Sequence, residues 1–180
     1  MRALSLEPAW TSPFMTHFLS ITLFPLLMIV AGAGDALSMR IPNWLTILIA
    51  IAFFPMALIT EMPFATLAIH SAIGAGLFVL GFMLFSFGVF GGGDAKLLAA
   101  AGLWFGGAAV AAFLVMTVLA GGLLALAVAV WSLASMDSKM KDGSLFKRLG
   151  AIKPNVPYGY AFAIGAILAF PQSWWMQVTG

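Results

Sequence analysis

Long apolar stretches, each about the length of a membrane-crossing helix, follow one another along this chain of 180 residues. Hydrophobic residues make up 63% of the sequence and charged residues 8%. Soluble domains contain roughly 45–50% hydrophobic and about 25% charged residues. A helix needs about 20 apolar residues to cross the hydrocarbon core of a bilayer. The sequence therefore predicts an all-α, polytopic membrane protein.

We expect one membrane-embedded domain over residues 1–180, built as a bundle of six transmembrane helices. The apolar stretch from Lys96 to Ser135 is too long for one crossing, so we divide it near Gly106. A basic segment, residues 136–156, precedes the last span. The expected spans are about residues 17–37, 44–60, 64–89, 94–105, 108–135 and 157–174.

The distribution of basic residues predicts the orientation of the bundle. Arg40, Lys96 and the segment 136–156 fall on one face, because two crossings separate each from the next. That face carries seven of the eight Lys and Arg residues. By the positive-inside rule it is cytoplasmic, and we expect the basic segment to contact anionic lipid there.

Two acidic residues, Asp35 and Asp94, lie within the apolar stretches. An ionisable side chain at membrane depth is costly and is functional by default. On the predicted topology both lie at cytoplasmic helix ends, at similar depth. Two carboxyl groups that meet in a low-dielectric site can share a proton, which suits water-driven cleavage of a peptide bond. The alternative is a small ion- or proton-coupled membrane transporter that uses the same two aspartates.

The sequence around these aspartates resembles the signatures of type IV prepilin peptidases, which are polytopic aspartyl proteases of the GxGD type. Asp35 matches the first catalytic aspartate of that family, and Gly91, Gly93 and Asp94 match GxGD. The likeness extends over nearly the whole chain. The matching segments are Arg40-Ile41-Pro42-Asn43, Gly91-Gly92-Gly93-Asp94-Ala95-Lys96 and Pro157-Tyr158-Gly159.

The resemblance implies that Asp35 and Asp94 are the catalytic residues. We expect Gly91, Gly92 and Gly93 to let a substrate approach, because glycines can adopt positive φ and have no Cβ in the way. The supporting motif positions are Arg40, Pro42, Asn43, Lys96, Pro157, Tyr158 and Gly159. Lys96 is also explained as an interfacial lysine, and Arg40 as a residue that fixes topology.

The resemblance further implies a membrane aspartic endopeptidase that removes the short basic leader from prepilins and pilin-like precursors. Its active site would lie at the cytoplasmic face of the bacterial inner membrane. The sequence lacks the extra cytoplasmic domain and paired cysteines of larger members, since it contains no cysteine. It resembles the peptidase-only CpaA/TadV group of Flp (tight-adherence) pilus systems. Expected partners are these precursors and membrane lipid; no metal, organic cofactor or nucleic acid is expected.

Helix position suggests different roles for the two aspartates. Asp94 lies near a predicted helix N-terminus, where the macrodipole favours a negative charge, and Asp35 near a helix C-terminus, where it does not. We therefore expect Asp94 to be the ionised base and Asp35 to hold the shared proton.

Two further patterns concern packing. Small residues recur four apart at Gly102 and Gly106 and at Ala161, Gly165 and Ala169. This spacing is typical of close helix–helix contact in membranes. Trp174 and Trp175, at the end of the last span, are interpreted as an interfacial anchor.

Overall fold

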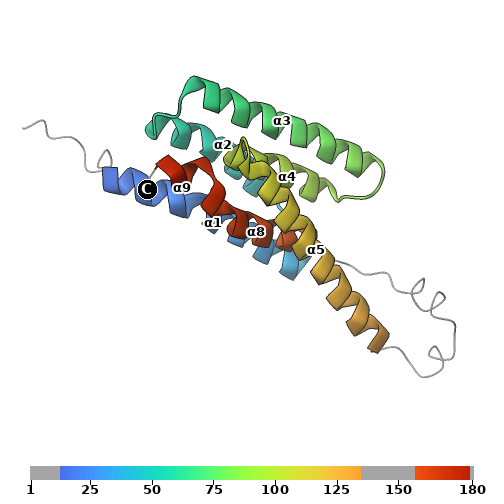
Figure 1. The fold of residues 1–180 in the computed structure, drawn as a ribbon. Coiled ribbons are helices and arrows are strands. Elements are labelled where there is room, and N and C mark those ends of the chain that lie inside the picture. The colour runs from blue at the N-terminus through green and yellow to red at the C-terminus, as the bar shows by residue number, and fades with distance from the viewer. Residues whose placement is uncertain (1–12, 135–156, 179–180) are drawn as a thin grey trace, which may run out of the picture.

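The computed structural model describes residues 13–134 and 157–178, nearly all of them helical (Figure 1). No β-strand occurs in these two segments, and the predicted all-α fold class is confirmed. The helices are α1 (Pro13–Ser38), α2 (Asn43–Ile59), α3 (Phe64–Ser86), α4 (Gly92–Phe105), α5 (Ala109–Ala134), α8 (Tyr158–Ala169) and α9 (Trp174–Val178), with the short 3-10 helix η2 (Phe170–Gln172) between the last two.

Proline or glycine marks the start of each helix that contributes to the interior of the bundle. Pro42 precedes α2, Pro63 precedes α3 and Pro157 precedes α8. Proline suits this position because its fixed φ and missing N–H remove nothing from the first helical turn. Gly91 precedes α4 in extended conformation.

Three helices are long and apolar enough to cross a membrane. The qualifying segments are Phe18–Ser38 in α1, Phe64–Ser86 in α3 and Ala109–Ser132 in α5, while α2 is apolar but shorter. Large apolar side chains cover the outer faces of these helices; Phe64 is 82% exposed and Val118 is 72% exposed. Exposed apolar surface on this scale is explained by contact with lipid. The chain is an all-α membrane protein.

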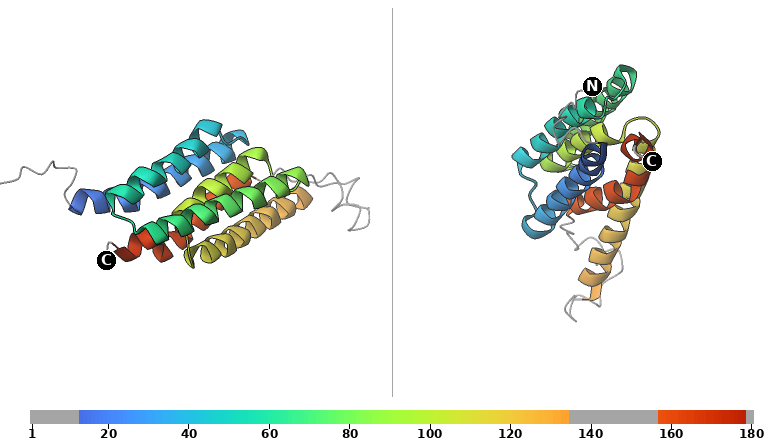
Figure 2. Two further views of the ribbon diagram at one scale, coloured as in Figure 1. Left: turned by 90° about the horizontal axis from the view of Figure 1, so that it is seen from above. Right: turned by 90° about the vertical axis from the view of Figure 1, so that its left-hand side faces the viewer.

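Two short helices, α4 and α8, form the interior of the bundle (Figures 1 and 2). Nine of the fourteen residues of α4 are buried, and this helix packs against α2, α3, α5 and α8. Helix α8 packs in turn against α1 and α5. The longer helices α1, α3 and α5 therefore flank the two shorter ones, although α8 keeps an exposed face that includes Leu168.

Small residues allow these close contacts, as predicted. A Cβ added at Gly102 would overlap the Leu77 side chain of α3 at 2.5 Å. A Cβ at Gly165 would overlap Thr117 of α5, and Gly121 of α5 faces Ala161 of α8. The expectation of close helix contact at Gly102, Ala161 and Gly165 is confirmed.

An aromatic cluster closes the end of the bundle where α4 finishes. Trp104 and Trp175 are fully buried; Trp104 donates its indole N–H to the carbonyl of Ile49 (2.9 Å), and Trp175 donates to the carbonyl of Trp104 (2.8 Å). The interpretation of Trp175 as an interfacial anchor is therefore wrong. The chain turns back into the bundle at Pro171, in η2, which places the indole in the core.

Two helix ends differ from the expected spans. α3 ends at Ser86 and not near residue 89, because Gly88 adopts a left-handed conformation (φ 72°) that starts the turn toward α4. The sixth expected span is divided, since α8 ends at Ala169 and α9 begins at Trp174. The basic segment 136–156 lies outside the described residues.

Candidate active site

Asp35 and Asp94 lie at the same end of the bundle, which we call the aspartate end. Here α1 ends and α2, α4 and α8 begin, on the right-hand side of Figure 1. The two carboxyl groups are close enough to interact electrostatically. The expected pairing of the two acids is thus compatible with the fold.

Asp35 lies in the last turn of α1 and is 5% exposed. Its Oδ2 accepts a 2.7 Å hydrogen bond from the backbone N–H of Gly159. This amide belongs to the first turn of α8. Asp35 therefore caps the N-terminus of a helix 124 residues further along the chain.

Asp94 lies in the first turn of α4 and is partly buried. Its Oδ2 accepts a hydrogen bond from the backbone N–H of Gly91 at 3.2 Å. Each aspartate is thus bound to the N-terminus of one of the two inner helices, where the helix macrodipole favours negative charge.

This arrangement removes the reason for assigning different roles to Asp35 and Asp94 from their positions in helices. Asp35 does lie near the C-terminus of α1, but its carboxylate is turned onto the N-terminus of α8. Both acids therefore experience the positive end of a helix dipole. The expectation that Asp94 alone does so is wrong.

Ile41 separates the starts of the two inner helices. A Cβ added at Gly159 would lie 2.7 Å from Cδ1 of Ile41, and one added at Gly93 would lie 3.1 Å from Cβ of Ile41. Ile41 is 9% exposed. One buried side chain thus fixes Gly93, next to Asp94, relative to Gly159, which binds Asp35.

The three consecutive glycines do not act through positive φ. None of Gly91, Gly92 and Gly93 has a positive φ, so that part of the expectation is wrong. The reason is that Gly91 caps α4 and the next two residues already belong to the helix. Gly91 and Gly93 instead provide space: a Cβ at Gly91 would lie 2.9 Å from Oδ2 of Asp94.

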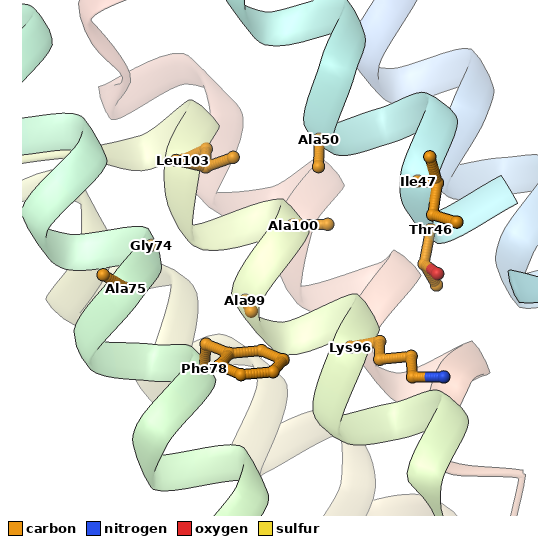
Figure 3. A pocket seen from close by; sticks show the side chains of 10 residues that line it. All are labelled: Thr46, Ile47, Ala50, Gly74, Ala75, Phe78, Lys96, Ala99, Ala100 and Leu103. Carbon is orange, nitrogen blue, oxygen red and sulfur yellow. The ribbon is translucent and has the colours of Figure 1, made fainter. Parts of the chain in front are cut away.

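The remaining motif residues surround this site. Lys96 Nζ donates a 2.8 Å hydrogen bond to Oδ1 of Asn43, which links α4 to the start of α2. Figure 3 shows Lys96 extending from α4 at the edge of an apolar groove of about 350 Å³ between α2 and α3. Arg40 and Tyr158 are exposed. Pro42 and Pro157 immediately precede α2 and α8, as expected.

Comparison with known proteins identifies the family of this chain. The model of the type IV leader peptidase family matches residues 22–126, which is more than half of the chain and includes both aspartates. The chain belongs to the type IV leader peptidase family. No curated protein and no solved structure shows significant similarity to it. Membership supports a peptidase of this class and favours it over the transporter alternative.

Two residues near the candidate site were missed by the sequence analysis. Ile41 was considered only as part of a motif, yet it packs between the two helix starts. The Phe90 ring lies 6.2 Å from that of Tyr158. The position of Phe90 directly before the motif glycine Gly91 could have indicated it, whereas nothing next to Ile41 indicates its contacts with Gly93 and Gly159.

Proposed function

We propose that this chain is a membrane aspartyl endopeptidase that removes the leader from type IV prepilins and pilin-like precursors, with Asp35 and Asp94 as the catalytic pair. One observation carries the proposal. Two partly or fully buried carboxyl groups lie at one end of the bundle, interact with each other, and are each held by the start of an inner helix.

The proposed reaction is hydrolysis by general acid–base catalysis. One ionised aspartate takes a proton from water as the water oxygen bonds to the scissile carbonyl carbon. The other, protonated, donates a hydrogen bond to the carbonyl oxygen. Collapse of the tetrahedral intermediate breaks the C–N bond, and the departing nitrogen takes up a proton from the aspartate pair, which returns to one ionised and one protonated carboxyl group. Two aspartates can share these tasks because two carboxyl groups that interact in a low-dielectric site do not both ionise readily.

The proposed location is the cytoplasmic face of the bacterial inner membrane. The aspartate end includes Arg40 and Lys96, and the predicted topology adds the basic segment 136–156 to the same side. A precursor with a basic leader and a hydrophobic helix would keep its leader in the cytoplasm. Its scissile bond would then lie at the depth of the two aspartates.

The substrate group is proposed from the sequence. The chain has no cysteine and lacks the cysteine-containing cytoplasmic insertion of larger family members, which favours Flp-type prepilins of the tight-adherence systems. Methylation of the trimmed pilin would then fall to another protein.

Co-expression with a candidate prepilin tests the proposal. We expect wild type to shorten the precursor, and Asp35→Asn and Asp94→Asn each to leave it uncut. Glu61→Gln is the matched control, because Glu61 lies in the turn between α2 and α3 at the opposite end of the bundle; it should cleave like wild type. Melting temperatures in detergent verify that the Asn variants fold. Cleavage by a folded Asn variant at the wild-type rate would refute the catalytic pair.

A further inference from the structure

An apolar groove of about 520 Å³ lies between α3 and α5, on the opposite side of α3 from the groove in Figure 3. α3 packs mainly on α4, and α5 mainly on α8, so the two outer helices leave the groove between them. Its walls include Leu84 of α3 and Val118 of α5, and its floor includes Leu98 and Phe162 of the inner helices. We call it the α3–α5 groove.

The α3–α5 groove ends beside the candidate active site. Phe90 and Tyr158 form that end, with ring centroids 6.2 Å apart. Phe90 immediately precedes Gly91, whose amide binds Asp94. Tyr158 immediately precedes Gly159, whose amide binds Asp35. A peptide leaving the groove at these two rings would therefore arrive at the starts of α4 and α8, where the two aspartates are bound.

The α5 wall of the groove suits a helix as its occupant. Gly122 lines the groove, and a Cβ added there would have no atom within 4 Å. Glycine on a membrane helix lets a second helix approach its backbone closely.

We propose that the α3–α5 groove holds the hydrophobic helix of the precursor during cleavage. This inference rests on the proposed function, and it assigns the route by which the substrate reaches the catalytic pair. The helix would lie against Gly122 and end at Phe90 and Tyr158, where its N-terminal flank becomes extended. The groove between α2 and α3 also reaches the aspartate end, but there it is bounded by Lys96, which already binds Asn43.

Cross-linking tests the site directly, since the natural chain has no cysteine. Single cysteines are introduced as Gly122→Cys in the groove, Ala75→Cys in the α2–α3 groove, and Gly76→Cys on the exposed outer face of α3. Each is combined with Asp94→Asn and a precursor carrying one cysteine in its hydrophobic segment. We expect a disulfide-linked product with Gly122→Cys only. A product with Ala75→Cys and none with Gly122→Cys would overturn the proposal.

Cleavage kinetics separate this proposal from the proposed function. Gly122→Leu should fill the groove and slow cleavage of the full precursor by about tenfold or more. The same variant should cleave a short peptide that lacks the hydrophobic helix at the wild-type rate. Gly76→Leu is the matched control and should cleave both substrates normally. If the aspartate variants are inactive but Gly122→Leu cleaves the full precursor normally, the peptidase assignment stands and the groove proposal fails.

Discussion

The backbone amide of Gly159 donates a 2.7 Å hydrogen bond to Oδ2 of Asp35, and so ties the end of α1 to the start of α8. Glycine is required at this position for reasons of space. A Cβ there would lie 2.7 Å from Cδ1 of Ile41 and 2.9 Å from both Cβ and Oδ2 of Asp35. Gly159, whose amide positions the Asp35 carboxylate, therefore has no room for a larger side chain.

Gly159→Ala should consequently disable the site. We expect a loss of about 1–3 kcal/mol in the free energy of unfolding and a fall in cleavage rate of about 100-fold, because the carboxylate is displaced. Gly34→Ala is the control, since Gly34 lies one residue before Asp35 and a Cβ there meets nothing within 4 Å. Thermal unfolding in detergent and precursor cleavage measure both effects. Wild-type activity of Gly159→Ala would contradict the proposed positioning of Asp35.

The glycines before Asp94 should respond unequally to replacement by alanine. A Cβ at Gly93 lies 3.1 Å from Cβ of Ile41, whereas one at Gly92 lies at an ordinary 3.6 Å from the Phe85 ring. Gly92 is already helical, so Gly92→Ala should raise stability by up to about 1 kcal/mol and preserve cleavage. Gly93→Ala should slow cleavage about tenfold or more by moving Ile41. Equal activity of the two variants would show that the Ile41 contact is unimportant.

Lys96 and Asn43 should be coupled in stability. Their hydrogen bond joins two exposed side chains, so its net contribution should be about 0.5–1 kcal/mol. We expect Lys96→Met, Asn43→Ala and the double variant to give a coupling energy of that size in a double-mutant cycle. Cleavage by all three should stay within about twofold of wild type, because neither side chain binds an aspartate. A large loss of cleavage with Lys96→Met alone would instead indicate a role in binding the substrate.

Gly106→Ala should destabilise the protein without involving the aspartate end. Gly106 has a positive φ of 51°, and a Cβ there would overlap the His70 imidazole. That ring is 2% exposed and its Nδ1 lies 2.6 Å from the carbonyl oxygen of Leu103. Strain and overpacking together should lower the free energy of unfolding by about 3 kcal/mol or more. Gly76→Ala, in an exposed helical position, should leave it unchanged or raised. A melting temperature unchanged by Gly106→Ala would refute the close packing at His70.

Much of the helical arrangement could be predicted because its signals are local. Apolar length gave the helices, and Pro42 and Pro157 marked where two of them start. The small residues Gly102 and Gly165 indicated close packing correctly. The membrane class followed from composition alone.

The contacts that determine the site could not be predicted, because they join distant parts of the chain. Nothing near Asp35 in the sequence indicates that its carboxylate binds Gly159. The same applies to Ile41, which packs against Gly93 and Gly159 together. Trp175 was misinterpreted for a related reason: its position after a hydrophobic stretch matches an interfacial residue, and only the turn at Pro171 returns it to the core.

The shortness of the two inner helices has a consequence for hydrolysis. Helices α4 and α8 contain 14 and 12 residues, so they rise about 18–21 Å, well short of the roughly 30 Å hydrocarbon core. Asp35 lies three residues before the end of α1 and binds the start of α8, and α4 begins just after the turn that follows α3. The short helices therefore start level with the ends of long ones, and the missing length falls at the opposite end of the bundle, where η2 and α9 turn back. A scissile bond held at the aspartate end would meet its second reactant, a solvent molecule, without that molecule crossing the hydrocarbon core.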